Sequence, residues 1–315
     1  MSSVTIGIPL YNEEEVFGSL LGRLEPVVRE LKKEHSTTVL FIDDGSTDDT
    51  PKLLDSATQN HSWVNYIRFS RNFGHQVALT AILDHCTDDI LITLDGDLQD
   101  PPELIPQLIQ RLNAGNEVVF VYRKTRDEPL LRRLTYSSYY RLLKFFWRIP
   151  VQLDSGDYAA FSRKAYESLR DFREVHRFHR GLRSWIGFRQ EGIGIERGAR
   201  SAGSSKYSLW KLFNLAFDGI FAFSIFPIRF SLFCGILLFL AGFGFSFFLL
   251  ASYVAGNELP TIYAVFGALT ALALGVNFVF LGIIGEYVGR IYEQVKGRPQ
   301  YLVERFVRKN GREIS

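Results

Sequence analysis

The chain has 315 residues, enough for two modest domains or for one domain with an appendage. Its 36 Lys and Arg nearly balance its 34 Asp and Glu, so the net charge gives no reason to expect a nucleic-acid partner. The two cysteines, Cys86 and Cys234, lie far apart and have no metal-ligand spacing, which argues against a disulfide framework. The 27 Phe are many for a soluble protein and indicate contact with lipid.

The first part of the chain alternates β-branched runs with helical patterns. In chain order, the runs VTIGIPL, TTVLFIDD, VNYIRFS, DILITLD and EVVFVYR are separated by helical patterns, notably Glu13–Glu34, Thr50–Ala57, His75–His85 and Pro102–Ala114. Such alternation favours an α/β fold with a mostly parallel sheet. We predict one such domain over residues 1–206, with its ligands bound beyond the carboxyl ends of the strands.

Three acidic segments fall at that edge of the predicted sheet: YNEEE, DDGSTDDT and DGDLQD. Carboxylates crowded together repel one another unless a cation shares the site. The chain has no Walker loop, and GIGIERG does not match GxGxxG, so glycine amides are not the main phosphate cradle. Oxygen ligands from Asp and Gln suit Mg²⁺ or Mn²⁺, which bind few protein groups together with substrate phosphates. We therefore predict a Mg²⁺ or Mn²⁺ ion that holds a diphosphate.

Two segments have the pattern of interfacial helices. The segment Glu128–Pro150 combines basic residues with Leu and Phe, as do helices that lie on anionic lipid. An amphipathic helix packed on the globular domain has the same pattern, and the sequence leaves both open. Residues 207–229 are rich in aromatic side chains and poor in charge, and we expect them to form an amphipathic juxtamembrane segment.

Two long uncharged runs follow. Between Arg229 and Glu258 lie 28 residues without a formal charge, and between Glu258 and Glu286 lie 27 more. About 20 helical residues are enough to cross a hydrocarbon core of about 30 Å. We predict that residues 230–286 form two transmembrane helices joined by a short external loop.

The flanking charges predict the orientation of these helices. The connector GNELP contains no Lys or Arg, whereas residues 287–315 form a basic tail. By the positive-inside rule, we expect the globular domain and both termini in the cytoplasm and the connector outside. The N-terminal MSSVTIGIPLYNEEE lacks a basic region and a long apolar run, so we expect no signal peptide.

Five motifs, in this order, resemble those of family-two glycosyltransferases with the GT-A fold, a Rossmann-like α/β domain: IPLYNEEE, FIDDGSTDDT, FSRNFGHQ, DGDLQDPPE and RSAGSSKYS. More narrowly, the motifs and the two spans resemble polyisoprenyl-phosphate glycosyltransferases of the GtrB and dolichol-phosphate mannose synthase type, over essentially the whole chain. The resemblance implies inverting, metal-dependent transfer of a hexose, commonly glucose from UDP-glucose, to a lipid phosphate such as undecaprenyl phosphate. The reaction would take place on the cytoplasmic face of a bacterial-type plasma membrane.

The resemblance also implies residues for the nucleotide and the metal. The residues expected to line the nucleoside pocket are Pro9, Tyr11, Asn12 and Glu13. Either Asp43 or Asp44 would accept a hydrogen bond from the base, although DDGS also has the composition of a turn. Asp97 and Gln99 are the expected metal ligands, with Asp95 shared between the metal and the ribose or diphosphate. Alternation along a strand would point Asp95 and Asp97 to one side, and Gly96, where the family usually has Ala, would face away.

The expected acceptor site is basic. The side chains expected to bind the lipid phosphate are Arg123, Arg132 or Arg133, Arg200, Ser205 and Lys206. For Arg200 and Lys206, general anchoring to lipid headgroups is the alternative. By resemblance, Asp157 is the base near the acceptor or orients the attacking oxygen, with Asp154 as its competitor.

The histidines have no zinc-site spacing. We expect His75 to border the donor pocket, and His176 and His179 to order a loop over the active site.

Two other functions compete with this interpretation. A processive polysaccharide synthase of the same fold would usually have a QxxRW motif and more spans, and RGLRSW does not match that motif. A catalytically inactive membrane adaptor would not need intact acids in all three segments. The sequence does not identify the sugar, and a homotetramer is a further expectation from family members with two spans.

Overall fold

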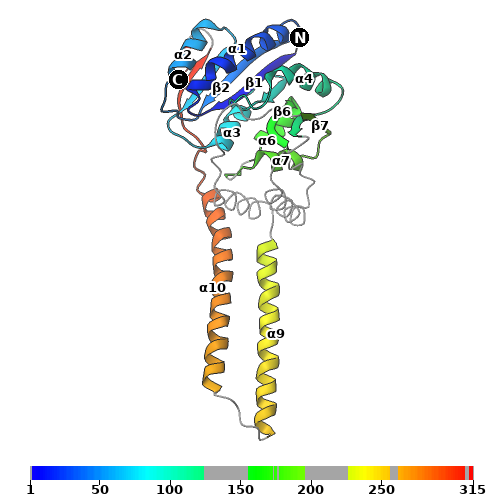
Figure 1. Ribbon diagram of the computed structural model, residues 1–315, viewed down its shortest axis with the longest axis vertical. Coiled ribbons are helices and arrows are strands. Elements are labelled where there is room, and N and C mark those ends of the chain that lie inside the picture. The colour runs from blue at the N-terminus through cyan, green and yellow to red at the C-terminus, as the bar shows by residue number, and fades with distance from the viewer. Residues whose placement is uncertain are drawn as a thin grey trace. The chain divides into compact units, whose positions relative to one another are not determined.

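The computed structural model describes residues 2–123, 155–172, 174–175, 177–195, 226–255, 262–308 and 312–314. In chain order the elements are β1 (Ser3–Leu10), α1 (Glu14–Leu31), β2 (Ser36–Asp43), α2 (Thr50–Asn60), β3 (Val64–Phe69), α3 (His75–His85), β4 (Ile90–Thr93), η1 (Pro102–Leu104), α4 (Ile105–Asn113), β5 (Val118–Arg123), β6 (Ser155–Ser162), α6 (Arg163–Arg170), α7 (His179–Trp185), β7 (Gln190–Ile195), α9 (Phe226–Val254), α10 (Ile262–Val295), β8 (Val303–Arg308) and β9 (Arg312–Ile314). They fall into two units: every strand of the described chain belongs to one, and α9 and α10 belong to the other (Figure 1).

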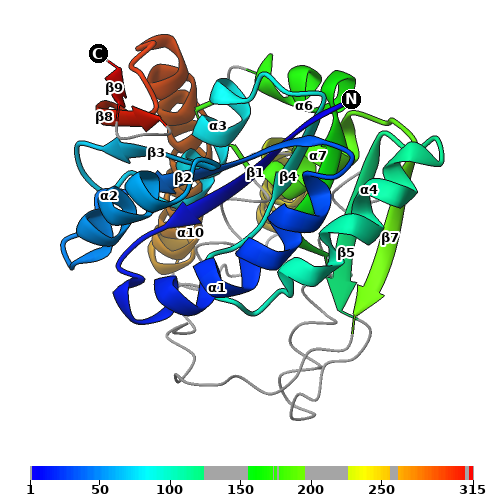
Figure 2. The ribbon, with the colours of Figure 1, turned by 90° about the horizontal axis from the view of Figure 1, so that it is seen from above.

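The strands form a nine-stranded sheet in the order β7-β5-β6-β4-β1-β2-β3-β8-β9. The neighbours β4, β1, β2 and β3 are parallel, and β5 is parallel to β7. Only β6 and β8, among the described strands, run against the others. Helices α1, α2 and α4 cover one face of the sheet and α3 and α6 the other (Figure 2). The predicted α/β fold with a mostly parallel sheet is confirmed.

The burial of the central strands explains why they fold as they do. Every residue of β1 from Val4 to Leu10 is buried, on both sides of the strand. A strand covered by helices on both faces has this continuous apolar pattern rather than strict alternation. In α1, Phe17, Leu20 and Leu24 recur on one side of the helix and are buried against the sheet.

Two predicted segments differ from the structure. The run DILITLD contributes a strand of four residues, Ile90–Thr93, so Asp95 already lies in a loop. The predicted basic tail, 287–315, is not a separate element: its residues Val303–Arg308 form β8, which pairs antiparallel with β3 inside the sheet. The apolar residues of this segment, Val303, Phe306 and Val307, do not alternate strictly with polar ones, so its sequence pattern does not indicate a strand.

The second unit contains the apolar helices. In the described chain, Val265–Val295 of α10 is the one stretch whose length and mean hydropathy of 2.1 suit a membrane crossing. The apolar part of α9, Phe230–Phe245, is shorter. The second predicted span and the topology remain predictions.

The loops after β2 and β3 are in backbone contact at Gly45. This residue has a φ of +66°, and a Cβ there would lie 2.3 Å from the carbonyl carbon of Arg71. Backbone atoms cannot yield as a flexible side chain can, so only glycine fits this conformation and this space.

We expect Gly45→Ala to destabilise the protein by more than about 1 kcal/mol, because it adds a left-handed-region penalty to a backbone clash. The measurement is the melting temperature of the purified chain. The control is Gly18→Ala in α1, where a Cβ meets nothing within 4 Å and alanine should stabilise the helix by about 0.5–1 kcal/mol. Equal melting temperatures for the two variants would contradict the contact.

Candidate active site

The loops after β1 and β2 are joined by hydrogen bonds at the carboxyl edge of the sheet. The amide of Asn12 donates to Ser46 Oγ at 3.0 Å, and Asn12 Oδ1 accepts from the amide of Thr47 at 2.8 Å. Asn12 has a φ of 55°, which asparagine tolerates better than most residues. The amide of Glu13 donates to Thr50 Oγ1 at 3.0 Å. Asn12 and Glu13 therefore hold the loop after β1 against the loop after β2.

The other two predicted nucleoside residues differ in exposure. Pro9 is buried within β1, whereas Tyr11 has 45% of its surface exposed. Of these two residues, Tyr11 is thus the one whose ring is exposed to solvent.

Both aspartates of the DDGS segment are buried and bonded to the protein. Asp43 Oδ1 accepts from the amide of Ser46 at 2.9 Å, and Asp43 Oδ2 lies 3.4 Å from Nε of Arg68. Asp44 accepts from two backbone amides, Phe73 at 2.7 Å and Gly74 at 2.9 Å. Burial raises the pKa of both carboxyls, against the lowering effect of these hydrogen bonds. Asp44 therefore fixes the start of α3, a role that the expectation of base recognition did not include.

The acidic loop after β4 is not an extended strand. Leu98 has a φ of 56°, and Asp97 Oδ1 accepts from the amide of Gln99 at 3.0 Å, which is a turn within the loop. The argument from strand alternation, which pointed Asp95, Asp97 and Gln99 to one side, therefore does not apply. A Cβ on Gly96 would meet Leu10 Cδ2 at 2.4 Å, so Gly96 faces the core, and an alanine there would have to displace Leu10.

Asp95 has the properties of a cation ligand. Its Oδ1 is buried and accepts no hydrogen bond, and burial raises the pKa of the carboxyl to about 6. In the described residues no group of three or more His, Cys, Asp or Glu side chains is arranged as a metal site. Magnesium sites at substrate phosphates usually use one or two carboxylates, and Asp95 with Asp97 fits that requirement.

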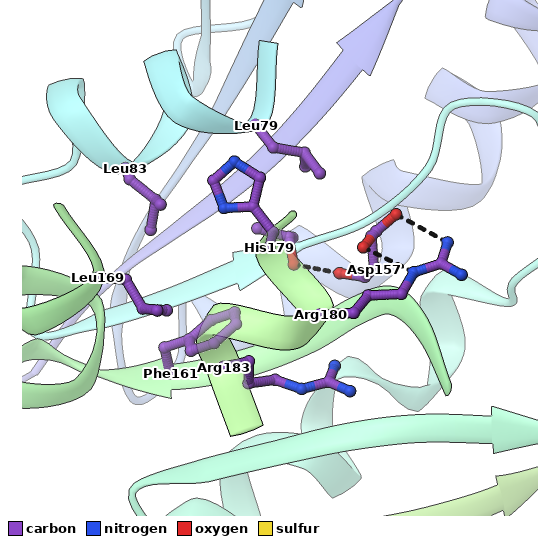
Figure 3. A pocket seen from close by; sticks show the side chains of 9 residues that line it. Leu79, Leu83, Asp157, Phe161, Leu169, His179, Arg180 and Arg183 are labelled. Carbon is purple, nitrogen blue, oxygen red and sulfur yellow. Dashed lines mark hydrogen bonds and ion pairs between the residues drawn. The ribbon is translucent and has the colours of Figure 1, made fainter. Parts of the chain in front are cut away.

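Asp157 lies in the middle of a chain of charged contacts that runs from Arg180 to Asp95. Its carboxylate binds Arg180 through two hydrogen bonds, Nε to Oδ1 at 3.0 Å and Nη2 to Oδ2 at 2.9 Å (Figure 3). Nε2 of His75 lies 3.5 Å both from Asp157 Oδ2 and from Asp95 Oδ1. These contacts bring together residues from the loop after β4, from β6, from α3 and from α7.

The charges around Asp157 make it a weak base. Burial would raise the pKa of this carboxyl, but the Arg180 charge and the hydrogen bonds from His75 and Arg180 hold it well below its usual range. A carboxylate with so low a pKa takes up a proton poorly at neutral pH. Of the two roles expected for Asp157, the geometry favours orientation over proton removal.

His75 and His179 have different roles. Burial lowers the pKa of His75, but the hydrogen bond to Asp157 and the charges of Asp95 and Asp157 outweigh it and raise the pKa. Burial lowers the pKa of His179 to about 4, and its Nε2 lies 2.9 Å from the backbone oxygen of Gln76 and 3.1 Å from Thr80 Oγ1. His179 therefore fastens α7 to α3; it was expected to order a loop over the active site, and the structure places it at the first residue of a helix instead.

The predicted acceptor residues fall largely outside the described part of the chain. Arg123 is the last residue of β5, and its backbone pairs with Ile195 of β7. The candidates that lie outside the described residues are Arg132, Arg133, Asp154, His176, Arg200, Ser205 and Lys206.

Sequence reasoning missed two arginines of α7. Arg180 binds Asp157, and Arg183 is buried with its guanidinium 4.4 Å above the ring of Phe120. Both belong to the segment HRGLRSW, which does not match QxxRW. The spacing of Arg180 and Arg183, three residues apart on a helix, is a signal that both face the same side.

The comparisons with known proteins agree with these features. The pattern of glycosyl transferase family 2 matches residues 5–170 of the chain. The chain belongs to this family. It is therefore a glycosyltransferase, with the GT-A fold and its mostly parallel α/β sheet.

Relatives of this glycosyltransferase match it over nearly its whole length. The SfII prophage-derived bactoprenol glucosyl transferase of Shigella flexneri is 34% identical over 98% of this chain and 99% of the relative. The prophage bactoprenol glucosyl transferase homolog of Escherichia coli is 33% identical over 96% and 98%. Glycosyltransferase YkcC of Bacillus subtilis is 37% identical over 96% and 93%.

Among solved structures, a mannosyltransferase from Pyrobaculum calidifontis in complex with GDP-Man and Mn²⁺ is 18% identical to the glycosyltransferase. It has a TM-score of 0.47 and covers 95% of this chain and 88% of its own. At that distance the likeness adds nothing to the family assignment.

We expect Asp44→Asn to destabilise the glycosyltransferase by about 1–3 kcal/mol, because one of two backbone amides would face an amide donor instead of an oxygen. The melting temperature should fall in the absence of any nucleotide. The control is Asp49→Asn, whose side chain is 63% exposed and pairs with Lys52, and which should change stability by less than about 0.5 kcal/mol. If Asp44→Asn keeps the parent melting temperature and loses only nucleotide affinity, Asp44 serves the base and not the loop.

Proposed function

We propose that this glycosyltransferase moves a hexose from a nucleotide sugar, with UDP-glucose as the first candidate, to a polyisoprenyl phosphate such as undecaprenyl phosphate. The observation that carries the proposal is the near full-length match to proteins named bactoprenol glucosyl transferase. A match that covers 98% of the chain includes the region of α9 and α10 as well as the sheet. The shared architecture supports an acceptor embedded in a bilayer.

The donor would bind at the carboxyl edge of β1, β2 and β4. Tyr11, at this edge, has an exposed ring for the nucleoside, and one of Asp43 and Asp44 would accept from the base. Asp95 and Asp97, joined by Gln99, would hold Mg²⁺ or Mn²⁺. When bound, such an ion supplies positive charge against the diphosphate leaving group.

The acceptor needs to be placed more than deprotonated. A phosphate monoester has a second pKa near 6 and is mostly a dianion at neutral pH. One oxygen of the acceptor would attack the sugar C1 from the side opposite the diphosphate, which inverts the anomeric centre. The residues proposed to hold the acceptor phosphate are Arg123, Arg132 or Arg133, Arg200, Ser205 and Lys206.

The membrane arrangement completes the proposal. Two helices would cross the bilayer, with α10 supported by its length and hydropathy. The catalytic unit and both termini would lie in the cytoplasm of a bacterial-type cell, where nucleotide sugars are made. The lipid bilayer would thus present the acceptor, and a homotetramer is compatible with this arrangement.

The proposal is tested by incubating the purified chain with undecaprenyl phosphate, Mg²⁺ or Mn²⁺, and a panel of radiolabelled UDP- and GDP-sugars. We expect label in the organic extract with at least one donor, and none when EDTA is in excess. Folded protein that labels no lipid with any donor would reject the proposal and favour an inactive adaptor. Labelled polymer without lipid-linked monosaccharide would indicate a processive synthase.

We expect Asp97→Ala to lower lipid labelling at least a hundredfold with little change in melting temperature, because Asp97 is exposed to the crevice rather than packed in the core. Manganese binding, followed by the EPR signal of free Mn²⁺ in the presence of UDP, should weaken in parallel. The control is Asp171→Ala, an exposed acid at the end of α6. Full activity of Asp97→Ala in the presence of EDTA would rule out the metal role.

We expect Arg200→Ala and Lys206→Ala to raise the KM for the lipid phosphate about ten- to a hundredfold, because each loses a charge-assisted contact to an anion. The KM for the nucleotide sugar should change less than twofold. Lys33→Ala, after the end of α1, is the control for a surface charge. An equal rise in both KM values would move these residues to the donor side.

A further inference from the structure

The pair of Asp157 and Arg180 is asymmetric in exposure. The side chain of Asp157 is 4% exposed, whereas that of Arg180 is 37% exposed. Both carboxylate oxygens are bound by the guanidinium, through Nε and Nη2 (Figure 3). A bidentate pair of this kind fixes the plane of the guanidinium. The buried acid therefore holds an arginine that reaches from the protein interior to the surface.

The acid that holds Arg180 lies close to the candidate cation site. His75 Nε2 is 3.5 Å from Asp157 Oδ2 and 3.5 Å from Asp95 Oδ1. A single imidazole therefore separates the acid that holds Arg180 from Asp95. Substrate phosphates bound at Asp95 would lie within reach of the α7 arginine.

The charge around Asp157 is not balanced by Arg180 alone. Arg183 lies one helical turn further along α7, donates to the backbone oxygen of Gly156 at 3.2 Å and is buried. Burial lowers the pKa of Arg183 to about 10, so this guanidinium is still charged at neutral pH. Arg180 binds the Asp157 carboxylate and Arg183 binds the neighbouring backbone oxygen, so two guanidinium groups accompany one carboxylate and the summed charge of these three side chains is positive.

We propose that Arg180 binds a phosphate oxygen of a substrate in this active site, and that Asp157 is the positioning residue that aims it. The inference rests on the proposed function and assigns a task to a residue that no sequence motif singles out. Arginine suits the task of binding a phosphate because a guanidinium that uses one edge for a carboxylate can still attract an anion by its charge.

The chemistry of transfer is complete without a protein base. An oxygen of the acceptor dianion forms a bond to C1 of the sugar. The bond from C1 to the diphosphate oxygen breaks, and its electron pair leaves with the nucleoside diphosphate. No proton has to be removed, so Asp157 is freed from the role of base, which its hydrogen bonds to Arg180 already make unfavourable.

The test is a double-mutant cycle on the full chain with Arg180→Lys, Asp157→Asn and the double variant. Arg180→Lys keeps the charge that compensates the buried acid but loses the two-pronged bond. We expect each single variant to lower kcat/KM about ten- to a hundredfold, with a raised KM for one substrate. The kcat/KM of the double variant should be no lower than that of the less active single variant, because the residues act as one unit. A raised acceptor KM identifies the lipid phosphate as the ligand, and a raised donor KM identifies the diphosphate.

The controls are Arg23→Lys and Glu103→Gln, another bidentate pair, in which Arg23 is 39% exposed. These variants should change kcat/KM less than twofold. Multiplicative losses in the double variant, with both KM values unchanged, would overturn the inference and restore Asp157 as an independent base.

The experiments distinguish a failure of this inference from a failure of the proposed function. If the parent chain labels no lipid, the proposed function fails, and calorimetric binding of UDP with Mn²⁺ and of farnesyl phosphate decides the role of Arg180. Weaker binding of either probe to Arg180→Lys supports the inference. Unchanged binding of both probes, with an unchanged melting temperature, overturns it.

Discussion

The site depends on one constraint, which is that carboxylates buried at the carboxyl edge of the sheet need partners. A buried acid is costly unless donors or cations compensate it, and each of these acids recruits a different partner. Asp44 takes two backbone amides and so fixes the start of α3. Asp157 takes the guanidinium of Arg180 and so fixes α7. The loops of the crevice are held by the same acids that give it its charge.

Asp95 differs from these acids because its partners in the protein are incomplete. Its Oδ1 accepts no hydrogen bond and lies 3.5 Å from His75. The raised pKa of about 6 expresses the cost of an ionised carboxyl in that environment. A positive charge arriving with the substrate would lower this cost, and the crevice is therefore built to be completed by its ligands.

The sequence predicted those parts of the fold that short-range patterns determine. The apolar runs identified five strands, and α3 was predicted with its observed ends, His75 and His85. The run DILITLD was too long, since β4 includes only its four residues Ile90–Thr93. In the site, the acids that follow buried strands could be recognised from the sequence. The hydrogen bonds between Asp157 and Arg180, in contrast, join residues 23 apart and depend on how α7 packs against β6. No local pattern contains that contact, and the low pKa of Asp157 follows from it.

The return of the chain to the sheet after α10 has a consequence for how the protein avoids association. Without β8, the strand β3 would present a row of unpaired N–H and C=O groups to any passing chain. The antiparallel pairing of β8 covers this side of β3 and moves the edge of the sheet to β9, a strand of three residues, and Tyr301 stacks on Phe69 at 4.9 Å. Residues that follow the apolar helices in the sequence thus shorten the exposed edge of the sheet, which guards the catalytic unit against edge-to-edge aggregation.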